Sequence, residues 1–297
     1  MTAPHPIVPP QLPATDAEAR AWIAAVDART AHHGVMVDGA RVVFRCVGEG
    51  PPLVLLHGGH GCWLHWVRSL DALARTRTLW LADMPSYGDS ATLADPPTLD
   101  RLAAAVATAI DGLPGLRGVP LDIAGFSFGG LVATHAAALR PAVRSLACIG
   151  VASHGQPRRE MPTMQDWKAI DDPAERDARL RHNLGALMLH DPARIDALAL
   201  AIHRSACERT RFRSAGFARR PLLQPALDRL SARGVPVLLA WGAHDVTGDP
   251  EVVGPLLAPA GTHRRWAVLP DAGHWVQYEN PEPLHALLLP WLDAPTA

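Results

Sequence analysis

Residues 121–139 read LDIAGFSFGGLVATHAAAL, and this stretch decides the fold. An apolar run ends at Gly125-Phe126-Ser127-Phe128-Gly129, and a run of small and apolar residues follows at once. The first run predicts a buried strand and the second predicts a helix. The residues between them fit G-x-S-x-G, in which a serine projects from a sharp strand-to-helix turn and nearby glycines leave room for it. The pattern predicts that this serine is displayed for reaction.

Short apolar runs alternate with helical patterns on both sides of this stretch. Strands are predicted at 41–47, 53–56, 78–82, 119–124, 145–151, 235–241 and 266–269, and helices at about 64–75, 98–112, 128–139, 251–258 and 281–292. Several strand runs are continuously apolar, which is typical of parallel strands covered on both faces. The alternation therefore predicts an α/β fold with a mostly parallel sheet flanked by helices.

The alternation stops between residues 154 and 228, where Arg, Ala and Leu recur with helical periodicity and no strand pattern. An insertion at the carboxyl ends of parallel strands lies over the edge where such sheets bind ligands. We expect 154–228 to form a helical cap, although an extra packing layer without a role in binding remains an alternative. The expected core is then 31–153 with 229–297, and residues 1–30 form an N-terminal arm and helix.

A serine nucleophile needs a base to take its proton and an acid to orient that base. In a strand–turn–helix arrangement of this kind the order along the chain is Ser, Asp or Glu, then His. Asp245 follows the apolar run at 235–241, and His274 follows the run at 266–269. Ser127, Asp245 and His274 are therefore the predicted catalytic residues.

Other acids and bases fit this arrangement less well. Asp249 lies further from the strand end, and Asp271 lies beside His274 itself. Among the bases, His244 adjoins the predicted acid and His135 falls on the helix after the serine.

A negative charge that develops during acyl transfer needs backbone N–H donors. The residue after the nucleophile, Phe128, is one predicted donor. The glycine-rich stretch HGGHG at 57–61 follows an apolar strand and supplies the second, for which we choose Gly59 with His60 as the alternative. His57 is expected to be a structural hydrogen-bonding residue.

These motifs together resemble the α/β-hydrolase fold superfamily, and in particular capped serine hydrolases such as esterases and meta-cleavage product (C–C bond) hydrolases. The resemblance rests on HGG at 57–59, DMPSYGDS at 83–90, GFSFGG at 125–130, WGAHD at 241–245 and GHW at 273–275. It implies an acyl-enzyme mechanism on a small to medium carboxylic ester, lactone or amide. C–C bond hydrolysis of a vinylogous diketone is the alternative activity, and a non-catalytic binding protein on the same fold is the second alternative.

Departures from family patterns narrow these options. Haloalkane dehalogenases and epoxide hydrolases of this fold carry Asp where this chain has Ser127, so the resemblance excludes them. C–C hydrolases typically have Asn at the position of Phe126, and Ser86 stands where Gly is common. Substrate contact is expected from the inner face of the cap and from side chains in and beside these motifs, namely His60, Trp63, Phe126, Met188 and Trp275.

Composition points to a small-molecule substrate. The chain has 28 Lys+Arg against 29 Asp+Glu, which gives no reason to expect a nucleic acid or membrane partner. Four widely spaced cysteines favour free thiols, and no metal-binding motif or cofactor requirement is evident. The N-terminus has no signal-peptide pattern, so a cytoplasmic location is expected. A homo-oligomer is compatible with the sequence, which does not decide the oligomeric state.

Overall fold

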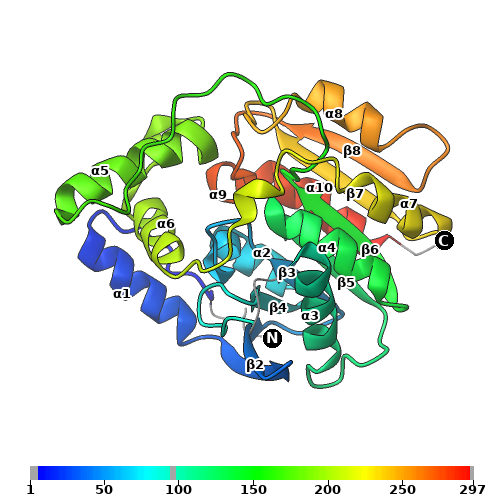
Figure 1. Ribbon diagram of the computed structural model, residues 1–297. Helices are drawn as coiled ribbons and strands as arrows, with labels where there is room; N and C mark the ends of the chain where they lie inside the picture. The colour runs from blue at the N-terminus through cyan, green and yellow to red at the C-terminus, as the bar shows by residue number, and fades with distance from the viewer. Residues whose placement is uncertain (1–5, 94–97, 295–297) are drawn as a thin grey trace.

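The computed structural model describes residues 6–93 and 98–294 (Figure 1). Its centre is an eight-stranded sheet in the order β1-β2-β4-β3-β5-β6-β7-β8. The strands are β1 (Ala31–Val37), β2 (Ala40–Val47), β3 (Pro52–Leu56), β4 (Thr78–Asp83), β5 (Leu121–Phe126), β6 (Val143–Ile149), β7 (Val237–Gly242) and β8 (Arg264–Leu269). Strands β1 and β2 pair antiparallel, and the pairs from β4 to β8 are parallel, which confirms the predicted mostly parallel sheet.

Helices cover both faces of the sheet because successive strand side chains point to opposite faces. In β3, Val54 and Leu56 join one apolar cluster, and Leu53 and Leu55 join the other. The first cluster includes side chains of α3 (Leu99–Asp111), α4 (Phe128–Leu139), α7 (Gln224–Ala232) and α8 (Pro250–Leu257). The second includes side chains of α1 (Asp16–Asp27), η1 (Trp63–Ser69), α2 (Leu70–Ala74), α9 (Val276–Glu279) and α10 (Pro281–Asp293). The fold is the predicted α/β-hydrolase fold.

Strand β1 is an addition to the predicted pattern. Its sequence AHHGVMV has no continuous apolar run, and only Val37 is buried. It lies at the sheet edge and pairs with β2 alone. An edge strand needs little apolar patterning, so sequence periodicity gives it no signal.

The segment between β6 and β7 contains helices and loops and no strand among its described residues; a cap role for residues 154–228 remains a prediction. It contains α5 (Pro173–Asn183), η2 (Leu184–Met188), η3 (Pro192–Arg194), α6 (Ala197–Glu208) and η4 (Ser214–Gly216). Figure 1 shows α5 and α6 to one side of the sheet, where α6 packs against α1. Helix α7 crosses the expected boundary at 228 and packs against α4 of the core. In the part of the chain that the structure describes, no helix is long and apolar enough to cross a membrane.

Candidate active site

Ser127 lies at the turn between β5 and α4, with φ 52° and ψ −120°. This left-handed conformation is uncommon for a residue with a side chain and marks local strain. A Cβ on Gly129 would lie 2.1 Å from the carbonyl oxygen of His57, and one on Gly125 would lie 2.4 Å from the carbonyl oxygen of Gly129. Because both contacts are with backbone, a side chain at either position would force the turn to shift. The sharp turn directs the Ser127 side chain out of the strand.

Ser127, His274 and Asp245 form one hydrogen-bonded chain. The Nε2 atom of His274 lies 2.8 Å from Ser127 Oγ, and its Nδ1 atom lies 2.9 Å from Asp245 Oδ2. Asp245 comes from the loop after β7 and His274 from the loop after β8, so residues distant in sequence meet at the carboxyl ends of the strands. An ionised carboxylate can only accept, so Nδ1 carries the proton and Nε2 is free to accept from the serine hydroxyl. The structure therefore brings together the three residues predicted from the sequence.

Asp245 is fully buried and has partners besides His274. Its Oδ1 accepts hydrogen bonds from the backbone N–H of Thr247 at 2.8 Å and from the Thr247 hydroxyl at 2.7 Å. Burial alone would raise the pKa of Asp245, but the charge and hydrogen bonds of His274 and Thr247 bring this pKa below its usual value. The acid is therefore ionised at neutral pH. Sequence reasoning did not identify Thr247, although its position two residues after the acid is typical of a local side-chain turn.

Asp249 and the two alternative bases are engaged elsewhere. Asp249 caps α8 and pairs with Arg159 at 2.7 Å. The ring of His244 stacks on His190 at 3.6 Å between centroids, and His135 Nε2 lies 3.0 Å from the carbonyl oxygen of Leu222.

The loop at residues 57–62, named here the oxyanion loop, lies against Ser127. A Cβ on Gly58 would lie 3.2 Å from Ser127 Cβ. The N–H of Gly58 donates to His65 Nδ1 at 3.2 Å, and its carbonyl oxygen accepts from His57 Nδ1 at 2.8 Å. Both backbone groups of Gly58 are therefore occupied, and Gly58 cannot serve as a donor to substrate.

Three other N–H groups beside Ser127 remain available. Those of Gly59, His60 and Phe128 have no acceptor among residues 6–93 and 98–294. These are the donors predicted from the sequence, and their role toward a substrate remains a prediction. His60 has φ 51°, so the loop turns sharply at the second of the two candidates on this side.

His57 has the hydrogen-bonding position expected for it. It is fully buried, and its Nε2 accepts the N–H of Met84 at 3.0 Å. Burial lowers the pKa of His57, so the ring is neutral and joins the oxyanion loop to the segment after β4. His65 has a similar role that sequence reasoning missed, because nothing in the sequence shows which of the chain's 15 histidines faces Gly58.

The residues predicted to contact substrate are mostly buried. The Phe126 ring lies between those of His65 and His274, with centroids 5.3 and 5.0 Å away. The indole N–H of Trp275 donates to the His65 carbonyl oxygen at 2.9 Å, and the backbone N–H of Trp275 donates to the Met188 carbonyl oxygen at 2.7 Å. These contacts place Phe126 and Trp275 around the two imidazoles.

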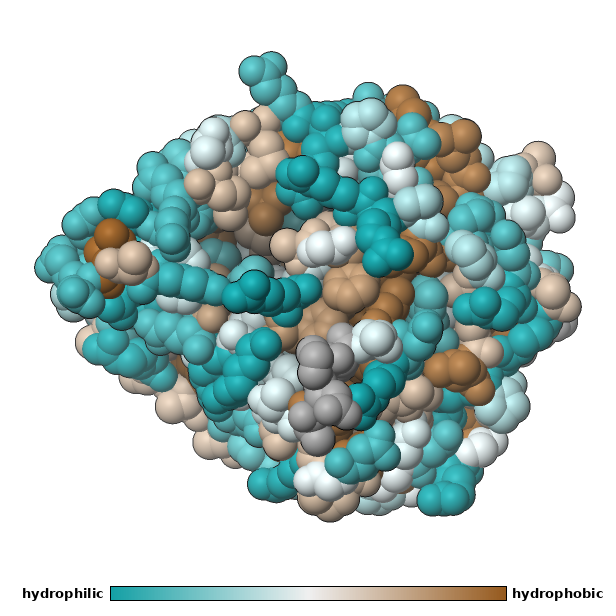
Figure 2. All heavy atoms as spheres, in the orientation of Figure 1, coloured by the Kyte–Doolittle hydropathy of each residue, from teal (hydrophilic) through white to brown (hydrophobic). Residues whose placement is uncertain are grey.

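The other two predicted contacts lie on the oxyanion loop and next to it. Trp63 packs beneath the guanidinium of Arg45, 5.1 Å from its ring centroid, and His60 is only partly buried. Figure 2 shows a recess in one face of the molecule, with apolar residues inside it and hydrophilic residues around it. Substrate contact remains a prediction for all five residues.

Comparisons with known proteins show what the chain is similar to. A family model described as "Alpha/beta hydrolase family" matches residues 53–287. The chain is 31% identical over 262 residues to the dihydrolipoyllysine-residue acetyltransferase component of the acetoin cleaving system of Pseudomonas putida, covering 84% of this chain. It is 40% identical over 108 residues, 35% of this chain, to the pimeloyl-(acyl-carrier protein) methyl ester esterase of Xanthomonas campestris. The match spans 65% of the length of the first relative and 38% of the second.

One solved structure has a similar fold throughout. A meta-cleavage product hydrolase from Pseudomonas fluorescens superposes with a TM-score of 0.69 at 18% identity, covering 87% of this chain and 96% of that one.

Proposed function

The chain belongs to the alpha/beta hydrolase family, and on that premise we propose that it is a serine hydrolase of small to medium carboxylic esters, including lactones and amides. The observation that carries the proposal is the hydrogen-bonded chain from Ser127 through His274 to buried, ionised Asp245. This arrangement lets a neutral imidazole take the serine proton while the carboxylate stabilises the imidazolium that results.

The proposed reaction has two halves. His274 takes the hydroxyl proton as Ser127 Oγ attacks the carbonyl carbon, and the same imidazole then donates that proton to the departing alcohol. Water next enters, His274 removes one of its protons, and the acyl-enzyme is hydrolysed to the free acid with Ser127 restored. Every proton transfer in this scheme uses a group of the chain or the attacking water.

The negative charge of each tetrahedral intermediate is assigned to the N–H groups of Phe128 and Gly59. Neither N–H has an acceptor among the described residues. Phe128 directly follows the serine, and a Cβ on Gly59 would lie 3.7 Å from Phe128 Cβ. Donors fixed before the reaction stabilise a developing oxyanion without further reorganisation, and removing one such donor typically lowers kcat by about 10²- to 10³-fold.

The residue before the nucleophile favours an ester over a C–C bond substrate. Phe126 is 1% exposed, and its side chain carries no hydrogen-bond donor or acceptor beside Ser127. A polar dienol substrate would find no hydrogen-bond partner in the Phe126 side chain, whereas a simple ester does not need one at this position. The 40% identity to a methyl ester esterase supports the same choice.

The first test is hydrolysis of short-chain p-nitrophenyl esters by the wild type and by Ser127→Ala. We expect steady turnover preceded by a product burst in the wild type, and neither in the variant. A fluorophosphonate probe should label the wild type at Ser127 alone, located by peptide mass spectrometry. A folded wild type that neither hydrolyses any ester of the panel nor takes up the probe would contradict the proposal.

A further inference from the structure

We propose that Asp83 and His65 are positioning residues that clamp the two ends of the oxyanion loop. This inference rests on the proposed function, because it concerns how the loop's N–H groups are aimed at the charge formed at Ser127. Neither residue is assigned contact with substrate; each acts through the backbone it holds.

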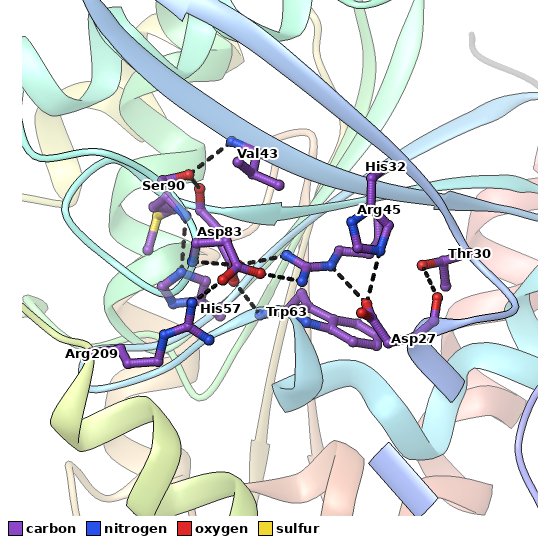
Figure 3. Close-up of polar contacts among 12 residues, drawn as sticks. Asp27, Thr30, His32, Val43, Arg45, His57, Trp63, Asp83, Ser90 and Arg209 are labelled. Carbon is purple, nitrogen blue, oxygen red and sulfur yellow. Dashed lines mark hydrogen bonds and ion pairs between the residues drawn. The ribbon is translucent and has the colours of Figure 1, made fainter. Parts of the chain in front are cut away.

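Asp83 holds the far end of the loop. It is the last residue of β4 and is 1% exposed, and its Oδ1 accepts the N–H of Trp63 at 2.9 Å (Figure 3). Its Oδ2 accepts the N–H of Asp89 at 2.9 Å and a hydrogen bond from Arg45 at 2.8 Å. Trp63 directly follows the oxyanion loop, so this carboxylate fixes where the loop ends.

Arg45 provides the counter-charge that lets a carboxylate lie at this depth. Figure 3 shows its guanidinium between Asp83 and Asp27, and it also pairs with Asp89. Burial raises the pKa of Asp83, and the Arg45 charge is the largest influence that opposes the rise. A buried ion pair of this kind loses much solvation energy on folding, so its presence is weak evidence for added stability and is compatible with a positioning role.

Gly88 makes room for the carboxylate. A Cβ at this position would lie 2.5 Å from both Asp83 oxygens, and the backbone there has φ +50°. Within the sequence DMPSYGDS, the chain therefore folds back so that the Gly88 backbone lies against the Asp83 carboxylate, which faces Trp63.

His65 holds the near end of the loop through the N–H of Gly58, which donates to its Nδ1 at 3.2 Å. The imidazole is 1% exposed and lies beside Phe126 and Trp275, with centroids 5.3 and 4.9 Å away. Burial and the neighbouring imidazoles keep the pKa of His65 well below its usual value, so the ring is neutral and Nδ1 has a lone pair to accept with. The packed ring can move little, and Gly58 is held with it.

The loop between these two anchors has little structure of its own. Residues 58–61 read GGHG, and glycine gives a backbone more freedom than any other residue. The N–H groups of Gly59 and His60, which have no acceptor in the described part of the chain, lie in this short stretch. The anchors at Gly58 and Trp63 therefore fix their direction. Oxyanion donors act well only when they are fixed in advance, and a misplacement of about 1 Å can lower a rate 10²-fold.

The variants Asp83→Asn and His65→Phe remove one anchor each at nearly constant shape. The amide oxygen of Asn can stay with Arg45 and the Asp89 N–H, the two donors at Oδ2, so its N–H₂ faces the Trp63 N–H. Phe leaves the Gly58 N–H without an acceptor. Asp122→Asn is the matched control, because Asp122 is also fully buried and lies 3.3 Å from Arg77 and 2.6 Å from the Ser145 hydroxyl. It lies in β5 about 16 Å of strand before Ser127, by a rise of about 3.3 Å per residue.

The main measurement is the second-order rate at which a fluorophosphonate labels Ser127, a step in which Oγ bonds to phosphorus and fluoride leaves. It needs no knowledge of the natural substrate. Relative to wild type, we expect labelling at least about tenfold slower for Asp83→Asn and His65→Phe, and within about twofold for Asp122→Asn. On an ester that the wild type hydrolyses, the two anchor variants should have a lower kcat and a KM changed less than about threefold. Their affinity for an alkyl boronic acid, which mimics the tetrahedral intermediate, should decrease in parallel with kcat/KM.

Thermal unfolding identifies the variants that fold. If only one of the two anchor variants folds, the labelling rate of that variant alone tests the clamp. The clamp would be overturned if the wild type is labelled and folded Asp83→Asn and His65→Phe react as fast as Asp122→Asn. The proposed function would then stay intact. A folded wild type with neither labelling nor ester turnover would overturn both.

Discussion

Replacing Asp245 with asparagine should lower kcat by about 10³- to 10⁴-fold, because it reverses the tautomer of His274. Two donors from Thr247, at 2.8 and 2.7 Å, converge on Asp245 Oδ1. In the variant the amide oxygen must stay with these donors, so the amide N–H₂ faces His274 Nδ1. The Nδ1 atom must then accept a hydrogen bond from the amide, so the ring proton moves to Nε2, which faces the Ser127 hydroxyl. The imidazole can no longer take the serine proton, and the lost transition-state stabilisation is about 4 to 5.5 kcal/mol.

The assay is pre-steady-state hydrolysis of a short-chain p-nitrophenyl ester, with Tm measured on the same preparations. Both acylation and deacylation need Nε2 as a base, so the burst should slow along with steady turnover. Thr247→Val is the companion variant, because it removes one of the two donors and leaves the carboxylate on His274. It should lose less than about tenfold, as expected for one hydrogen bond of about 1 kcal/mol. Folded Asp245→Asn with more than a tenth of the wild-type kcat would refute the reasoning and return Asp249 and Asp271 to consideration.

Three further predictions concern stability and the turn at the serine. His203 is buried with a pKa lowered to about 4, chiefly by burial, so the unfolded chain binds a proton between pH 6.5 and 4 that the folded chain does not. The stability that neutral His203 contributes is complete above pH 6.5 and is lost as the pH falls. Urea unfolding should therefore show a free energy of unfolding roughly 2 kcal/mol lower at pH 5 than at pH 7 from this group. The difference between the two pH values should be smaller in His203→Phe. Gly129→Ala should destabilise the fold by about 3 kcal/mol, since its Cβ meets the His57 carbonyl oxygen at 2.1 Å. Gly216→Ala has nothing within 4 Å and should change the free energy of unfolding by less than about 0.5 kcal/mol in the same titration.

The parts of the fold that sequence predicts well are those where one local rule dominates. Continuous apolar runs located the parallel strands because both faces of such strands are covered, and β5 through α4 followed from one elbow motif. Strand β1 lacked this signal because it is an exposed edge strand with a single ladder partner. Helix α7 crossed the expected boundary at 228 because helical periodicity does not reveal which neighbour a helix packs against.

The same division applies within the site. Ser127, Asp245 and His274 could be predicted because each follows a strand whose position is visible in the sequence. His65 could not, because its contact with Gly58 depends on how η1 folds back against the loop. Likewise, patterns identify aromatic residues near the motifs but not which atoms face substrate, and the structure places Phe126 and Trp275 in packed surroundings.

The glycines that make the oxyanion loop useful are also why it needs support from elsewhere. Glycine at 58 lets the backbone approach Ser127 closely, yet glycine at 58, 59 and 61 removes the side chains that would otherwise restrict the loop. The restraint therefore comes from buried side chains outside the loop, and their polar atoms need partners in turn. Arg45 meets that need for Asp83, and its contacts with Asp27 and Asp89 extend the network to α1 and to the segment after β4. With the proposed clamp, the conformation of the oxyanion loop depends on the charge of Asp83, and the motif at 83–90 belongs with the chemistry of the site.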